Sequence, residues 1–229
     1  MGLSIGPDYK SRSAYVPRTT PTVFVVDDDI AVRESLELLI ASAGWHPETF
    51  ASAQQFLSRP RVLGPSCLIL DVSLPDLSGL DLQKRVAVER VDMPIIFITG
   101  NGDVPMTVQA MKEGAVEVLT KPFSNDVLLN VIWYAIERSE TALDHEAEIH
   151  ALQENHKLLS RREHEVMTLV VSGLLNKQVA AELGISEITV KTHRGQAMRK
   201  MKAKSFAELV RMATRLGLGA APNGWIADR

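Results

Sequence analysis

The chain has 229 residues, a formal net charge of -3 and 45% hydrophobic residues. This length allows one large domain or two small domains that each bury a core. No apolar stretch approaches the ~20 residues of a membrane-spanning helix, and the sequence begins without a signal-peptide core, so we expect a cytoplasmic protein. The single cysteine, Cys67, excludes an internal disulfide and indicates a reduced compartment.

Residues 1–20 mix Gly, Pro, Ser and basic residues without periodicity, which predicts a disordered tail. In residues 21–138, apolar runs alternate with helical patterns. The runs, mostly β-branched or aliphatic as in buried parallel strands, lie at 23–26, 67–70, 94–98 and 116–120, and residues 45–50 are counted as the second strand. The helical patterns lie at about 31–43, 52–58, 79–90, 104–113 and 124–138. This alternation predicts an α/β doubly wound, parallel five-stranded sheet covered on both faces.

Polar residues stand at the ends of these predicted strands. They are Asp27, Asp28, Asp71, Thr99 and Lys121, and they should converge because the carboxyl ends of parallel strands form one crevice. Clustered carboxylates repel one another unless a hard cation such as Mg²⁺ binds them. Asp71 alone follows the most apolar run, which suits a nucleophile that forms an aspartyl phosphate. Lys121 and the Thr99 hydroxyl would then bind phosphoryl oxygens.

Residues 139–157 are polar and free of Pro and Gly, which predicts a helical linker that continues the preceding helix. A coiled coil is an alternative there, although the heptad pattern is poor. Residues 158–217 are entirely helical in pattern, and the segment 157–215 carries 12 Lys and Arg against five Asp and Glu. Such an excess of positive charge suggests a polyanionic partner. Residues 218–229 are rich in Gly, Ala and Pro and should fray.

Residues 180–186 have the pattern of a helix, a tight turn and the start of a second helix, which is typical of a helix-turn-helix. Asn176 and Ser186 are the predicted N-caps of the two helices. Capping-box patterns also occur at 160–163 and 205–208.

The second helix of this motif spans about 187–201 and should have a buried and an exposed face. The predicted core side is formed by Ile188, Ala197, Met198 and Met201. The predicted outward side is formed by Lys191, Thr192, Arg194 and Gly195. These outward residues are cationic, hydroxylic or small, and suit phosphates and base edges.

Residues 22–138 resemble the receiver domain of two-component response regulators, most closely the FixJ-type subgroup. The matching segments are 25–29, 70–79, 98–106 and 120–123. The resemblance implies that Asp71 accepts phosphate from a histidine kinase. It implies a Mg²⁺ site formed by Asp28, Asp71 and the Ser73 carbonyl, with Asp27 acting through water. Thr99 and Lys121 would sense the phosphoryl group, with Thr99 moving toward it.

The family often has an aromatic switch residue three positions before the lysine, where this chain has Val118. Repacking around Thr99 and the 104–113 helix would therefore carry the signal. The family dimerises through a face that corresponds to residues 104–119. The apolar side chains there could contact a partner or serve as ordinary helix core, and they are Met106, Val108 and Met111.

Residues 158–216 resemble the LuxR/NarL-type DNA-binding domain, in the segments 159–167, 173–180 and 185–194. The resemblance implies that bases are faced by Lys191, Thr192 and Gly195. It implies that phosphates are approached by Asn176, Lys177, Ser186, Thr189 and Arg194. The last helix, 205–216, would be the family's dimerisation element, and a dimer would bind two half-sites of double-stranded DNA.

We therefore predict a response regulator, not an enzyme, that activates transcription when Asp71 is phosphorylated and the protein forms a homodimer. Its expected partners are a sensor histidine kinase, promoter DNA and RNA polymerase. One alternative is a phosphatase of the haloacid-dehalogenase type with Asp27 as nucleophile, although Ala31 stands where that family has Thr or Val. The other is a DNA-binding protein that works independently of phosphorylation.

Overall fold

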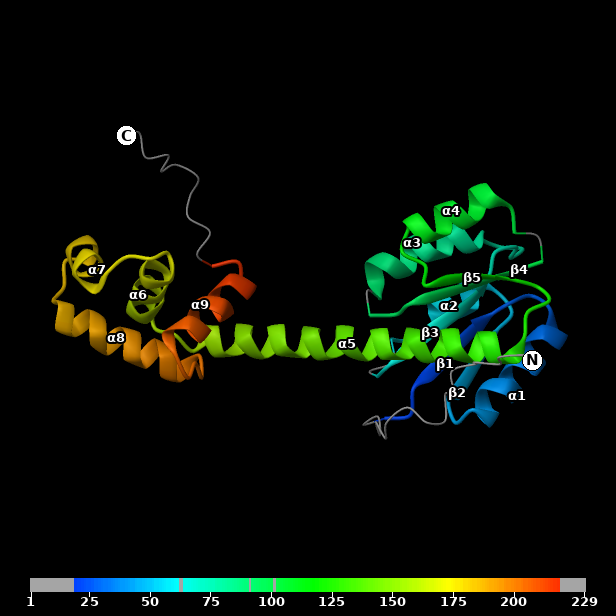
Figure 1. The fold of residues 1–229 in the computed structure, drawn as a ribbon, viewed down its shortest axis with the longest axis horizontal. Helices are drawn as coiled ribbons and strands as arrows, with labels where there is room; N and C mark the ends of the chain where they lie inside the picture. Colours follow the sequence, from blue (N-terminus) through cyan, green and yellow to red (C-terminus); the bar gives the residue numbers. More distant parts are fainter. Residues whose placement is uncertain (1–18, 62–63, 91, 101, 219–229) are drawn as a thin grey trace, which may run out of the picture. The chain divides into compact units, whose positions relative to one another are not determined.

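The residues that the computed structural model describes are 19–61, 64–90, 92–100 and 102–218. They form two compact units that divide between Asp144 and His145 (Figure 1). The tails predicted at 1–20 and 218–229 lie almost wholly outside the described residues. None of the helices in the described ranges combines the length and the apolar character that crossing a bilayer requires.

The first unit is built on a parallel sheet. Its strands are β1 (Thr22–Val26), β2 (His46–Phe50), β3 (Ser66–Asp71), β4 (Ile95–Thr99) and β5 (Glu117–Thr120), in the order β2-β1-β3-β4-β5. All neighbouring strands are parallel. The helices that alternate with them are α1 (Ile30–Ser42), α2 (Ala53–Ser58), α3 (Gly79–Glu89), α4 (Val104–Lys112) and α5 (Asn125–Lys157). The predicted five-stranded, doubly wound fold is confirmed.

Two hydrophobic cores cover the two faces of the sheet because successive strand residues point to opposite faces. Phe24 and Leu68 belong to the core that includes residues of α2, α3 and α4. Val25 and Ile69 belong to the core that includes residues of α1 and α5. Cys67 is buried in this second core as a free thiol, and burial raises its pKa. Because both faces of the sheet are covered, polar side chains can reach a ligand at the carboxyl ends of the strands.

Two elements differ from the simplest expectation. The apolar pattern at 116–120 predicts a buried strand, but in β5 both Glu117 and Thr120 are exposed, because β5 is the last strand of the sheet. The helix predicted at 124–138 and the linker predicted at 139–157 form one helix, α5.

The second unit packs helices around two small cores. Its further helices are α6 (Arg161–Val171), α7 (Asn176–Leu183), α8 (Glu187–Lys200) and α9 (Phe206–Arg215). Leu152 of α5 joins one core with residues of α6, α8 and α9, and Val179 and Val190 belong to the other. Gly184 ends α7 with φ of 64°, a left-handed conformation that favours glycine. The structure thus has the predicted helix, tight turn and second helix.

The helix caps confirm some predictions and correct others. The capping box at 160–163 is complete, and Ser186 caps α8 by accepting from the Thr189 amide at 3.1 Å. The prediction that Asn176 caps α7 is wrong. Leu175 holds the cap position, where its amide donates to Gln178 Oε1 at 2.8 Å.

The box predicted at 205–208 forms only in part. Ser205 Oγ accepts from the Glu208 amide at 3.1 Å. Glu208 Oε2 in turn accepts from the amide of Lys204 at 2.7 Å, one residue before the cap. The Glu208 carboxylate near the start of the helix therefore still pairs with a backbone amide.

One residue of α8 faces the opposite way from its prediction. Ala197 and Met201 are buried as expected, but Ile188 exposes 76% of its surface and Val190 is the buried residue of the first turns. At 100° per residue, Val190 lies on the same side of the helix as Ala197 and Met201, whereas Ile188 lies on the other side.

Candidate functional site

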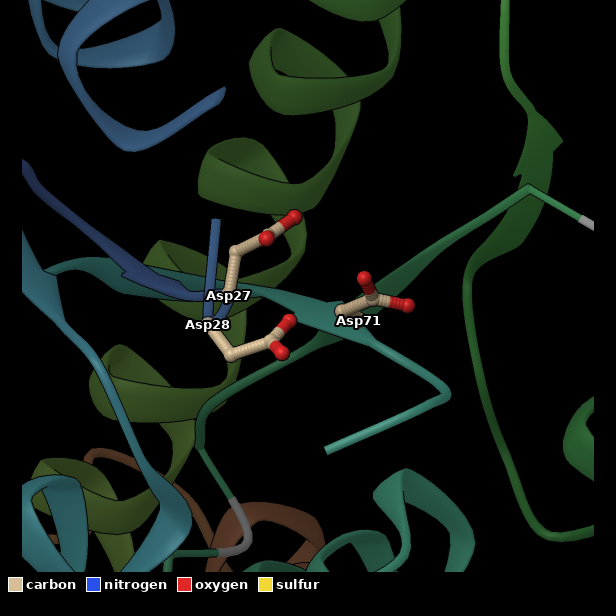
Figure 2. A group of neighbouring side chains, drawn as sticks. All are labelled: Asp27, Asp28 and Asp71. Carbon is tan, nitrogen blue, oxygen red and sulfur yellow. The ribbon is translucent and has the colours of Figure 1, made fainter. Parts of the chain in front are cut away.

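Three carboxylates gather at the carboxyl end of the first unit's sheet (Figure 2). Asp27 and Asp28 follow β1, and Asp71 is the last residue of β3. The two strands are neighbours, with Val26 paired to Leu70, so the residues that follow these positions come side by side. One oxygen of each carboxylate lies within 4.8 Å of the others. The predicted cluster is therefore present in the structure.

The acidic turn after β1 is held by its own backbone and by one arginine. Asp27 Oδ1 accepts from the Asp29 amide at 2.9 Å, and Asp29 caps α1 by accepting from the Ala31 amide at 2.8 Å. Arg33 Nη1, from the first turns of α1, donates to the carbonyl oxygens of Asp27 and Asp28 at 2.7 and 2.9 Å. These bonds fix the turn, so that the Asp28 carboxylate projects from a defined backbone.

Lys121 joins two of the carboxylates. It follows β5, and its Nζ lies 2.8 Å from Asp27 Oδ2 and 3.2 Å from Asp71 Oδ2. Burial raises the pKa of the Asp27 carboxyl, against the hydrogen bonds from Lys121 and the Asp29 amide. Desolvation alone would lower the pKa of Lys121, but its bonds and charge interactions with Asp27 and Asp71 raise it. The peptide bond between Lys121 and Pro122 is cis.

Asp71 ends β3 with only a small part of its surface exposed. Its Oδ1 accepts from the amide of Ser73, an exposed residue of the following loop, at 3.1 Å. Gly79 begins α3 directly against this strand end, and a Cβ atom there would lie 2.6 Å from the Asp71 carbonyl oxygen. Glycine at this position therefore lets α3 begin close behind Asp71.

Thr99 lies one strand away from Asp71. β4 pairs with β3, and Asp71 is opposite Ile98, so Thr99 is one residue beyond that pair and almost fully buried. Oxygen ligands from three carboxylates suit a hard divalent cation, and the exposure of Asp28 leaves room for bound water. The residues present thus fit Mg²⁺.

The helix predicted as a dimerisation face is largely exposed. Val108 and Met111 of α4 each expose 44% of their surface, and Ala110 is the buried residue of the helix. For these two side chains the alternative of ordinary helix core is therefore wrong. Val118 in β5 is half-buried and packs against the core beneath α4.

In the second unit, the residues predicted to face bases are all exposed on α8, and they are Lys191, Thr192 and Gly195. Arg194 is partly buried and donates to Asn176 Oδ1 at 3.2 Å, which connects α8 to the start of α7. Asn176 thus binds a neighbouring helix instead of capping its own.

The sequence did not indicate Arg33 as part of the acidic site. Its role depends on two bonds to backbone oxygens, and a residue pattern carries no signal for such bonds. The spacing of five residues after Asp28 places it one turn into α1, which is a signal only once the helix start is known.

Both units resemble known families. Residues 23–133 match the response regulator receiver domain, and residues 157–213 match the bacterial regulatory proteins of the luxR family. The chain is 47% identical over 214 residues to Nodulation protein W of Bradyrhizobium diazoefficiens, and this match covers 93% of this chain and 94% of that protein. It is 42% identical over 196 residues to Transcriptional regulatory protein FixJ of the same organism, covering 86% and 96%.

Two solved structures of response regulators are also similar to this chain. The response regulator StyR aligns with a TM-score of 0.75 and 43% identity, over 86% of this chain and 100% of that one. Full-length FixJ from B. japonicum aligns with a TM-score of 0.52 and 42% identity, over 87% and 98%.

Proposed function

Because the chain belongs to the response regulators that join a receiver domain to a LuxR-type DNA-binding domain, we propose that Asp71 is the phosphorylation site through which it regulates transcription. The observation that supports this choice is the geometry at the sheet edge. Asp71 lies within one cluster with Asp27 and Asp28, and Lys121 reaches its Oδ2.

The reaction requires a phosphodonor, which in this family is a phosphohistidine of the sensor kinase. An oxygen of Asp71 forms the new P–O bond, while the donor P–N bond breaks and its electron pair stays on the imidazole nitrogen. Asp28, Asp71 and the Ser73 carbonyl would hold Mg²⁺, with Asp27 acting through water, and the ion would supply positive charge that offsets the charge of the phosphoryl group. Lys121, already 3.2 Å from Asp71 Oδ2, is placed to bind a phosphoryl oxygen.

The phosphoryl group would act on the surface of the unit through Thr99 and α4. A phosphoaspartate adds negative charge and acceptor oxygens that the Thr99 hydroxyl can bind. We propose that Thr99 moves toward the phosphoryl group and that this movement repacks α4, where Val108 and Met111 are already exposed. The repacked helix would favour a homodimer.

The DNA-binding part of the proposal rests on the exposed side of α8. Lys191, Thr192 and Gly195 would face bases there. The residues proposed to approach phosphates are Asn176, Lys177, Ser186, Thr189 and Arg194. Activation of transcription then follows from contact of the bound dimer with RNA polymerase.

The phosphatase alternative would make Asp27 the nucleophile. Asp27 is fully buried, and its two oxygens bind the Asp29 amide and Lys121. Asp71 is the less enclosed of the two carboxylates, which favours it as the acceptor.

The experiment is phosphorylation of the full chain with acetyl phosphate and Mg²⁺, measured as the mass gain of the intact protein. Wild-type protein should gain one phosphoryl group, and the Asp71→Asn variant should gain none. Asp76→Asn is the matched control, because Asp76 accepts from backbone amides, among them those of Ala53 and Gln54 in α2, and its replacement should leave the gain unchanged. A wild-type gain in Asp71→Asn would refute the assignment.

A further inference from the structure

The exposed face of α8 contains a large apolar side chain that the proposed DNA contacts do not use. Ile188 exposes 76% of its surface at the start of this helix. Helical spacing of three, four and seven residues places on the same face the exposed residues Lys191, Thr192 and Gly195. The cores of the second unit are filled from the other side of the helix, by Val190, Ala197 and Met201.

Thr192 has already committed its hydroxyl proton. Its Oγ1 donates to the carbonyl oxygen of Ile188, one turn earlier, at 3.0 Å. A threonine bound in this way can accept a hydrogen bond but has no proton left to donate to a base. What it adds beside Ile188 is its methyl group, so the two side chains form a small apolar spot on an otherwise polar face.

The charge around this spot indicates which partner covers it. Lys191 is beside it, and the exposed Arg199 continues the same face three turns on. A face that combines cations with an apolar spot fits the major groove, where the thymine 5-methyl group is the apolar feature of the base edges. The phosphates that border the groove also supply the negative charge that the lysine and the arginine require.

We propose that Ile188, together with the Thr192 methyl group, contacts a thymine methyl and determines the preference for thymine at the base pair it faces. Lys191 next to it would bind guanine O6 and N7 at a neighbouring pair. This inference rests on the proposed DNA-binding function and adds the reading of a base to it.

The test uses double-stranded DNA that the phosphorylated full chain itself selects from a randomised library. Each thymine of the selected half-site is replaced in turn by deoxyuridine, which removes the 5-methyl group and leaves the base pairing unchanged. For wild-type protein, at one position per half-site, affinity should fall about fourfold for the lost methyl group. The Ile188→Ala variant should bind the thymine and uracil forms equally.

The controls separate the contact from the fold. Ile188 is exposed, so its truncation leaves both cores intact. Leu158→Ala removes a similarly exposed leucine outside α8 and should keep the full thymine effect. Thr192→Val keeps the methyl group and should preserve most of the effect, whereas Thr192→Ser removes it and should reduce the effect.

The outcomes are distinct. If wild-type protein shows no thymine effect, or if Ile188→Ala retains it, this inference is refuted while the proposed DNA binding stands. If the phosphorylated chain retains no DNA from the library, the proposed DNA binding itself fails.

Discussion

Replacing Lys121 by Met should destabilise the first unit most strongly when Mg²⁺ is absent. The ammonium lies 2.8 Å from Asp27 Oδ2 and 3.2 Å from Asp71 Oδ2, and its side chain is only 25% exposed. Removing one partner of a buried ion pair costs about 3–5 kcal/mol, and the partial exposure of Lys121 reduces this to about 2–3 kcal/mol. Mg²⁺ supplies positive charge to the same carboxylates, so excess Mg²⁺ should recover at least half of the loss.

The loss should also depend on pH. Burial already raises the pKa of Asp27, and removal of Lys121 raises it further. The variant is therefore penalised while Asp27 is ionised, and the penalty disappears as the pH falls below the raised pKa and the carboxyl is protonated.

The assay is urea unfolding at neutral pH with and without Mg²⁺. Tryptophan fluorescence reports on the first unit through Trp45 and Trp133, with Trp225→Phe in every variant to remove the third tryptophan. Lys121→Arg keeps the charge and should lose little, and Lys112→Met is an exposed control at the end of α4. Equal losses with and without Mg²⁺ would refute the idea that ammonium and cation act on the same carboxylates.

Three further perturbations follow from the same contacts. Arg33→Gln should weaken Mg²⁺ binding several-fold in titration calorimetry, because the acidic turn loses two carbonyl contacts; tighter binding would show that the lost charge matters more than positioning. Gly79→Ala should cost about 1–3 kcal/mol in urea unfolding, since its Cβ would meet the Asp71 carbonyl at 2.6 Å, and unchanged stability would exclude that close approach. Desolvation raises the pKa of Glu163, but bonds from Lys200 and Ser160 hold it below its ordinary value overall. The second unit should therefore lose stability as the pH falls through this lowered pKa, and Glu163→Gln should remove this part of the acid sensitivity.

The acidic site was predictable because its residues end strands. A strand end is visible as an apolar run followed by a polar residue, and a parallel sheet brings such ends together whatever the loops do. This was enough to place Asp27, Asp28, Asp71 and Lys121 in one site. It could not place Arg33, since its bonds go to backbone oxygens that every residue has.

The errors in the second unit have a similar physical origin. Asn176 is a good N-cap residue in isolation, but Gln178 and Arg194 determine where α7 begins and what the Asn176 side chain binds. Hydrophobicity alone predicts that Ile188 is buried, whereas the helical phase set by Val190 leaves it exposed. Local propensity identifies the elements, and tertiary packing decides the cap and the phase.

The central claim is that phosphorylation of Asp71 controls DNA binding. The most direct measurement compares the affinity of the full chain for its selected DNA before and after treatment with acetyl phosphate and Mg²⁺, in wild type and in Asp71→Asn. The account predicts that the phosphodonor tightens binding by wild-type protein and leaves the variant unchanged, with both affinities falling steeply as salt rises. Equal affinity of wild-type protein with and without the phosphodonor would contradict it.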